Sequence, residues 1–143
     1  MQLTKKYVFI LNERGAPKQR PAWYRGKAVT PKKTRDYESL LAELFTLQMR
    51  GKEIIGADTP IKITVRFIYK VPKSWSQTKQ EKALNGELYP IGSNIPDVDN
   101  ACKSLLDGMN KVVYVDDKVV VELNSSKKYG TEDQIIVVIE SVN

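Results

Sequence analysis

The sequence has 143 residues, of which 41% are hydrophobic, and its 23 Lys or Arg against 17 Asp or Glu give a net charge of +6. This composition fits one folded domain over residues 1–143 and excludes a disordered chain. The absence of histidine and the single cysteine, Cys102, exclude Ser-His-Asp catalysis, most zinc sites and an intrachain disulfide. No apolar run approaches the ~20 residues of a transmembrane helix, and the N-terminus lacks a secretory signal. We therefore expect a cytoplasmic protein without membrane association.

The first third of the chain predicts a strand, a long loop and a helix. Residues 7–11 are β-branched or aromatic and favour a strand, whereas residues 12–30 are polar, contain two glycines and two prolines, and predict a loop. Thr30 as the cap and Pro31 as the first helical residue open a helix that Gly51 ends. Helical spacing predicts that its buried face consists of Tyr37, Leu40, Leu41, Leu44 and Leu47.

The same part of the chain is strongly basic. Residues 1–35 carry ten Lys or Arg and a single acid, Glu13. Such a lobe is typical of a surface that steers DNA or RNA, or it is a solvated loop without a partner. Trp23 and Tyr24 lie within it. These aromatics can stack on unpaired bases or pin the loop to the body of the protein, and we expect the second role.

The remainder predicts a sheet interrupted by two helices. Hydrophobic periodicity predicts, in chain order, a strand at 61–69, a short helix at 77–84, a helix at 98–109, and strands at 112–115, 119–124 and 134–141. Val98, Cys102, Leu105, Leu106 and Met109 form one apolar stripe of the second helix. The expected fold is α+β, with a small mixed sheet of about four to five strands and two main helices packed on it.

Four aspartates surround the predicted helix at 98–109. Asp97 and Asp99 lie at its start with Lys103 one turn later, and Asp116-Asp117 precedes the next strand. If that strand returns beside the helix, two to four carboxylates converge near one point. Carboxylate oxygens are ligands that suit Mg²⁺ or Mn²⁺. A divalent ion in a positively charged protein points to a phosphate polymer as the substrate.

Each part of this cluster also has a purely structural interpretation. An aspartate at a helix start is a favoured cap, and Asp116-Asp117 between two valine-rich runs is ordinary turn chemistry. Asp99 and Lys103 can form a surface ion pair of small energy. Asp107 lies two turns along the helix, and we assign it to this structural class. The full set at this spacing, in a chain without histidine, favours the metal site.

The Asp97–Lys103 segment, read as Asp-x-Asp-Asn-x-x-Lys, together with Asp116-Asp117 resembles the RusA family of Holliday junction resolvases. These are small bacterial and phage or prophage endodeoxyribonucleases. The likeness extends to the Val29–Thr34 stretch and to Pro72-Lys73-Ser74-Trp75-Ser76, and it covers nearly the whole chain.

The resemblance implies specific roles. Asp97, Asp99 and Asp117 match the family's catalytic metal ligands, Asp116 matches the neighbouring acid, and Lys103 matches the catalytic lysine. It also implies a homodimer that makes paired nicks across a four-way DNA junction with Mg²⁺ or Mn²⁺. Such an enzyme would serve DNA recombination and repair in the cytoplasm of a bacterium or of a phage-infected host.

Basic side chains of the loop, the first helix and the segment after strand 61–69 are the expected DNA contacts. They are Arg20, Arg25, Lys27, Lys32, Lys33, Arg35 and Lys73. Two alternatives stay open. One is a nuclease of the same chemistry acting on other branched DNA, such as flaps or forks. The other is a non-catalytic DNA-binding module whose acids serve as caps and turn residues.

Overall fold

A four-stranded mixed sheet organises the protein, in a computed structural model that describes residues 5–19 and 22–142. Its strand order is β1-β6-β4-β5, and the bounds are β1 (Lys6–Leu11), β4 (Ile61–Lys70), β5 (Val120–Gly130) and β6 (Gln134–Ser141). Strand β6 pairs antiparallel with both β1 and β4, whereas β4 and β5 run parallel. The predicted α+β class and the size of the sheet are confirmed.

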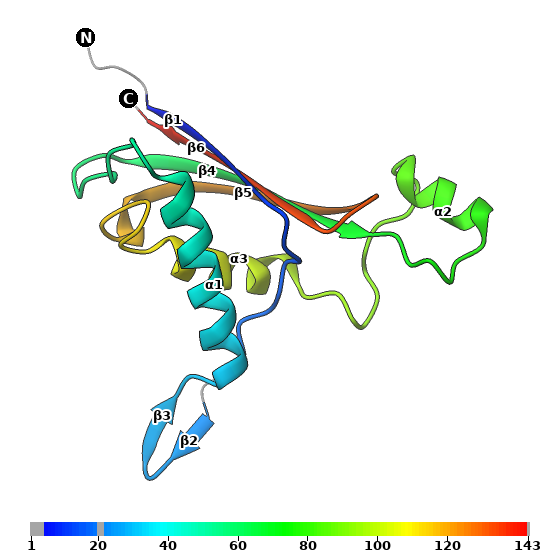
Figure 1. The fold of residues 1–143 in the computed structure, drawn as a ribbon, viewed down its shortest axis with the longest axis horizontal. Coiled ribbons are helices and arrows are strands. Elements are labelled where there is room, and N and C mark those ends of the chain that lie inside the picture. Colours follow the sequence, from blue (N-terminus) through cyan, green and yellow to red (C-terminus); the bar gives the residue numbers. More distant parts are fainter. Residues whose placement is uncertain (1–4, 20–21, 143) are drawn as a thin grey trace.

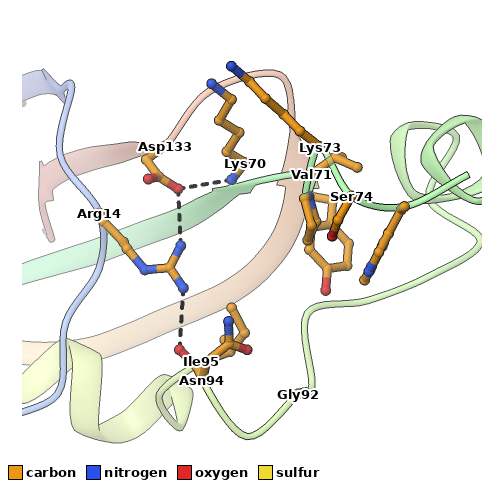
Figure 2. A pocket seen from close by; sticks show the side chains of 12 residues that line it. Arg14, Lys70, Val71, Lys73, Ser74, Gly92, Asn94, Ile95 and Asp133 are labelled. Carbon is orange, nitrogen blue, oxygen red and sulfur yellow. Dashed lines mark hydrogen bonds and ion pairs between the residues drawn. The ribbon is translucent and has the colours of Figure 1, made fainter. Parts of the chain in front are cut away.

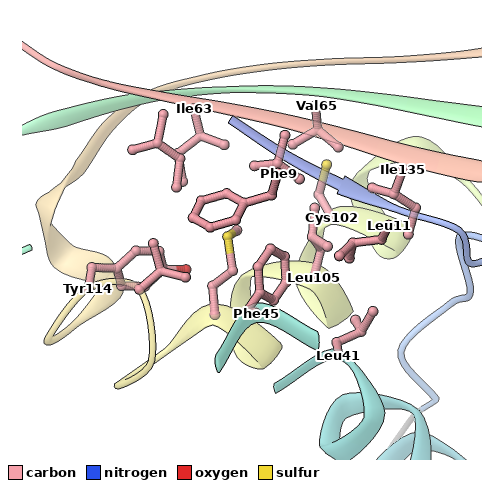
Figure 3. Close-up of a cluster of buried hydrophobic side chains, with 14 of the residues drawn as sticks. Phe9, Leu11, Leu41, Phe45, Ile63, Val65, Cys102, Leu105, Tyr114 and Ile135 are labelled. Atoms are coloured by element: carbon pink, nitrogen blue, oxygen red, sulfur yellow. The ribbon is translucent and has the colours of Figure 1, made fainter. Parts of the chain in front are cut away.

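Two helices, α1 (Lys32–Gln48) and α3 (Val98–Met109), lie on the same side of the sheet, and the shorter α2 (Gln77–Leu84) stands at the far end of β4 (Figure 1). The core fills the space between the helices and the sheet, with Phe9 meeting Phe45 edge to face at 5.3 Å (Figure 3). None of the helices in the described ranges has the length and apolarity needed to cross a bilayer.

The burial pattern of β4 follows its sequence directly. Ile61, Ile63, Val65, Phe67 and Tyr69 are buried, and the residues between them are only partly covered. This period of two confirms the predicted half-buried strand, because successive side chains of a strand point to opposite faces. The predicted apolar stripe of α3 is confirmed in the same way, with Cys102, Leu105 and Met109 buried.

Helices α1 and α3 approach closely at Gly108. A Cβ atom at this position would stand 2.9 Å from the Cβ of Leu41, closer than packed carbons allow. We therefore expect Gly108→Val to lower the free energy of unfolding by about 1–3 kcal/mol through overpacking, as urea denaturation would measure. Gly56→Val is the matched control, since a Cβ there meets no atom within 4 Å. Equal stability of both variants would show that the helices do not depend on this contact.

The start and the buried face of α1 differ from the prediction. Pro31 has a ψ of 145°, so the helix begins at Lys32, and Thr30 is not its cap. Leu41 is buried and Tyr37 and Leu44 pack against the core, as predicted. Leu40 and Leu47, in contrast, are 36% and 53% exposed, and the buried face includes Thr34 and Phe45 instead. The spacing of the apolar residues predicts that one face of the helix is buried. The angle at which α1 packs against α3 decides which residues of that face are covered.

The predicted strand at 112–115 is wrong, because this segment turns back under the sheet instead of joining it. Tyr114 is fully buried there, and its hydroxyl donates a hydrogen bond of 2.8 Å to the carbonyl of Leu106. Only isolated bridges to Ile55 and Asn110 are present. Strand β5 in turn extends to Gly130 rather than ending at residue 124, because it pairs with β4 along that strand's whole length.

The predicted loop at 12–30 contains a hairpin, β2 (Ala22–Tyr24) and β3 (Lys27–Val29), which projects past the start of α1 (Figure 1). Its two-residue turn has positive φ at Arg25 (51°) and Gly26 (75°), as such tight hairpins require. Trp23 is 77% exposed and Tyr24 62% exposed. The expectation that these aromatics pin the loop to the body is therefore wrong.

Candidate active site

The first acidic pair, Asp97 and Asp99, occupies the N-terminal end of α3. Asp97 holds the cap position but makes no side-chain capping bond, and Asp99 follows in the first turn. Both side chains are exposed. The interpretation of Asp97 as a helix cap thus holds for its position but not for a capping hydrogen bond of its side chain. Carboxylates at a helix N-terminus complement the helix dipole, so this placement does not disfavour the fold.

Lys103 lies one turn beyond Asp99 on the same helix and is exposed. Among the ion pairs of the described residues, none joins Lys103 to Asp99. The surface ion pair considered from the sequence does not form. The N-terminal half of α3 thus presents two carboxylates and an ammonium group to solvent without engaging them in the fold.

The second acidic pair, Asp116 and Asp117, stands where the chain enters β5 through a short 3₁₀ turn (Asp117–Val119). The pKa of Asp116 is lowered, first by the hydrogen bond of 2.9 Å that the Lys118 backbone N–H donates and then by the adjacent Asp117 carboxyl. The pKa of Asp117 is raised, mainly by its hydrogen bond with Asp116. The two acids thus titrate as a pair that competes for one proton. A bound cation would relieve the repulsion between their two negative charges.

Asp107 has the structural role expected for it. Lys18, from the first loop, donates hydrogen bonds to both Asp107 and Glu38, the latter at 3.2 Å. The Asp107 bond is the largest cause of a raised Lys18 pKa. This contact ties the loop to α1 and α3 at once. Sequence reasoning missed it, because Lys18 and Asp107 are 89 residues apart and no local pattern links them.

The two acidic pairs do not meet within one chain. Lys127, late in β5, donates a 3.1 Å bond to the Pro96 carbonyl, so the start of α3 lies beside the far end of that strand. The second pair precedes the strand's first residue. The charge of Asp107, near the C-terminal end of α3, contributes to the raised pKa of Asp117, so this pair lies near that end of the helix. Helix α3 has 12 residues and is about 18 Å long.

The structure accordingly contains, within residues 5–19 and 22–142, no group of three or more Asp, Glu or Cys side chains that could hold one ion. The sequence predicted that two to four carboxylates converge if the strand returns beside the helix, and within the described part of one chain no three of them do so. The physical reason is direction: α3 runs back along β5, so its N-terminal acids and the acids preceding β5 lie at opposite ends of the helix.

The predicted DNA contacts lie on exposed positions. Arg25 and Lys27 belong to the projecting hairpin, and Lys32, Lys33 and Arg35 occupy the first turns of α1 beside it; all are exposed, as is Lys73 after β4. Arg20 lies outside the described residues. Hairpin and helix start together form one basic projection, here called the basic arm (residues 22–35), on which DNA binding stays a prediction.

Comparison with known proteins places the chain in a family. A family model described as endodeoxyribonuclease RusA matches residues 14–140. An uncharacterised Bacillus subtilis (strain 168) protein, YqaN, is 36% identical over 115 residues, which is 79% of this chain and 78% of that protein. A crossover junction endodeoxyribonuclease, rusA, of Lactococcus phage r1t is 32% identical over 112 residues, covering 76% of this chain and 73% of the phage protein. The chain belongs to the RusA endodeoxyribonuclease family.

Proposed function

We propose that this protein is a divalent-metal-dependent endodeoxyribonuclease that acts as a homodimer and resolves four-way DNA junctions by paired cuts during recombination and repair. The proposal rests on the exposed carboxylates Asp97 and Asp99 with Lys103 beside them, in a chain of this family. The Asp97 carboxylate makes no capping hydrogen bond to the helix. The phage relative is named a crossover junction endodeoxyribonuclease, which supports a branched DNA substrate.

The donor set fits Mg²⁺ or Mn²⁺. All four acids offer hard carboxylate oxygens, and the described residues contain one thiol, Cys102, which is buried, and no imidazole that would draw a softer metal. Asp97, Asp99 and Asp117 would hold the ion, with Asp116 as a further ligand. When bound, the ion would supply charge stabilisation at the scissile phosphate and activation of the attacking water.

A two-fold dimer would unite what the single chain separates. Strand β5 is a sheet edge, and its Val121 and Leu123 are 62% and 43% exposed, a surface suited to pairing with a second copy. Antiparallel pairing of two β5 edges sets the start of one strand beside the far end of the other. Asp116 and Asp117 of one copy would then face Asp97 and Asp99 of its partner.

The remaining residues have simple roles in this scheme. Lys103, one turn from Asp99, would stabilise the negative charge that builds on the phosphate during attack, or assist the leaving oxygen. The basic arm and Lys73 would bind phosphates away from the cut. Two equivalent half-sites related by a two-fold axis match a junction whose opposed strands are equivalent, which accounts for paired cuts.

The direct test is cleavage of a labelled four-way junction by the wild-type protein with Mg²⁺, beside a flap, a fork and a linear duplex of the same sequence. We expect paired nicks in the junction, little cleavage of the other substrates, and no cleavage with EDTA. Equal cleavage of flaps or forks would replace junction resolution by a broader branched-DNA activity. Binding without cleavage of any substrate would leave only the DNA-binding module.

A further inference from the structure

A pocket of about 580 Å³ opens beside the N-terminal end of α3 (Figure 2). It lies between the end of β4, the segment after it and the 92–95 segment, and it is completed by Tyr129 of β5, Asp133 just before β6 and Arg14 from the loop after β1. The residues that matter for its chemistry are Arg14, Lys73, Trp75, Asn94, Tyr129 and Asp133. Its volume lies in the range of sites that bind small molecules.

One side of the pocket is a fixed guanidinium. Arg14 is held by the Asp133 carboxylate at 3.5 Å and by the carbonyl of Asn94 at 3.3 Å (Figure 2). Its guanidinium also lies 4.9 Å from the centre of the Tyr69 ring. Asp133 also accepts the Lys70 backbone N–H at 2.9 Å. A guanidinium positioned by three neighbours keeps its remaining donors aimed into the pocket, which suits a planar polar group or a phosphate oxygen.

The opposite side is aromatic. Trp75 and Tyr129 meet edge to face at 5.3 Å and are both only partly buried, so ring surface remains open. Lys79 lies over one face of the Trp75 ring at 3.9 Å, so a base would have to use the opposite face. Lys73 is exposed at the rim, and within the described residues it enters no ion pair. In Figure 2 the Lys73 side chain extends away from the rings, so it would turn toward the pocket to meet a phosphate, which its flexible stem allows. A partly open aromatic surface with such a cation on the same segment can hold a base together with its phosphate.

The position of the pocket gives it a function. Ile95, which lines it, precedes Asp97 by two residues, so their Cα atoms are at most about 7 Å apart. A nucleotide bound here would therefore neighbour the phosphate at the acidic pair. Fully paired bases are stacked inside a duplex and present no free face, so only an unpaired nucleotide could lay its base on these rings.

We propose that this pocket binds one unpaired nucleotide of the DNA strand next to the cut, with the base against Trp75 and Tyr129 and its phosphate at Lys73. The inference rests on the proposed function for the identity of the strand, but the binding itself requires neither metal nor cleavage. In a four-way junction such a nucleotide arises where a base pair opens at the branch point, so the pocket would favour a junction over continuous duplex.

Fluorescence of Trp75 tests this proposal directly. The chain has two tryptophans, so Trp23→Phe leaves Trp75 as the sole reporter. This variant, in EDTA, is titrated with a thymidine oligonucleotide and with an abasic oligonucleotide that has the same number of phosphates. We expect saturable quenching of Trp75 by the thymidine strand and binding at least about tenfold weaker by the abasic strand, in line with the contribution of one stacked base.

A matched pair of variants completes the experiment. By fluorescence anisotropy of a labelled thymidine oligonucleotide, Trp75→Leu should weaken binding about tenfold, whereas Leu47→Ala, an exposed position at the C-terminal end of α1, should leave it within about twofold. Equal affinity for thymidine and abasic strands, or equal effects of the two substitutions, would overturn the proposal. Junction cleavage by the wild type with no response of Trp75 would refute the pocket and keep the nuclease. Quenching of Trp75 without junction cleavage would keep the pocket and refute the nuclease.

Discussion

Asp99→Asn should slow junction cleavage by more than about a hundredfold while leaving junction binding as tight as in the wild type or tighter. Even groups that only support a metal ligand contribute about 10–100-fold to metal affinity or activity, so loss of a ligand itself should cost more. Binding should survive because Asp99 is exposed and makes no contact that the fold needs. Removing its charge also reduces repulsion of phosphate.

The measurement pairs single-turnover cleavage with a Mn²⁺ titration by calorimetry, so that metal affinity is read independently of activity. Asp58→Asn is the control, since Asp58 is an exposed acid in the loop before β4, far along the chain from both acidic pairs. Wild-type cleavage by Asp99→Asn, or the same loss in Asp58→Asn, would remove Asp99 from the metal site.

Lys103→Ala should also slow cleavage about 10²–10³-fold, the typical cost of losing one positioned charge or hydrogen-bond donor at a reacting centre. Here Mn²⁺ affinity should be unchanged or higher, because no ligand is lost and a nearby positive charge is removed. The Mn²⁺ titration therefore distinguishes Lys103→Ala from Asp99→Asn, although both substitutions impair cleavage. Lys103 is exposed, so no loss of stability is expected.

Lys82→Ala provides the comparison for this second variant. Lys82 is an exposed lysine in the last turn of α2 and lies outside both acidic pairs. The Lys82→Ala variant should cleave the junction at the wild-type rate. Should Lys103→Ala retain full cleavage, or lose Mn²⁺ binding in step with activity, its assigned role in stabilising charge at the phosphate would be wrong.

Local periodicity predicted the elements whose burial follows from their own sequence. Strand β4 alternates strictly, and the apolar stripe of α3 needs only one covering surface, so both were predicted correctly. The segment 112–115 has the composition of a strand, but Tyr114 and Val113 are buried in the core, and backbone bonds with Ile55 hold the segment as a turn. Such contacts with distant residues override local preference and leave no local trace.

The site shows the same difference between what local sequence patterns predict and what depends on distant contacts. The sequence predicted the acids and Lys103 as site residues by type and spacing, and the structure leaves Asp97, Asp99 and Lys103 exposed, which is compatible with that prediction. Whether the two acidic pairs meet depends on the direction in which α3 crosses the sheet, which no spacing encodes. The pocket at Trp75 depends on Arg14 and Tyr129, which lie 115 residues apart in the chain.

The central claim is that each metal centre is built from two copies of the chain, and subunit mixing tests it most directly. Asp99→Asn and Asp117→Asn subunits carrying different tags are co-expressed, and the mixed dimer is purified and assayed on the four-way junction. A shared site predicts that each homodimer is inactive, whereas the mixed dimer retains one intact centre and nicks one strand. A mixed dimer as inactive as both homodimers would show that all the acids act within one chain, and would contradict the claim.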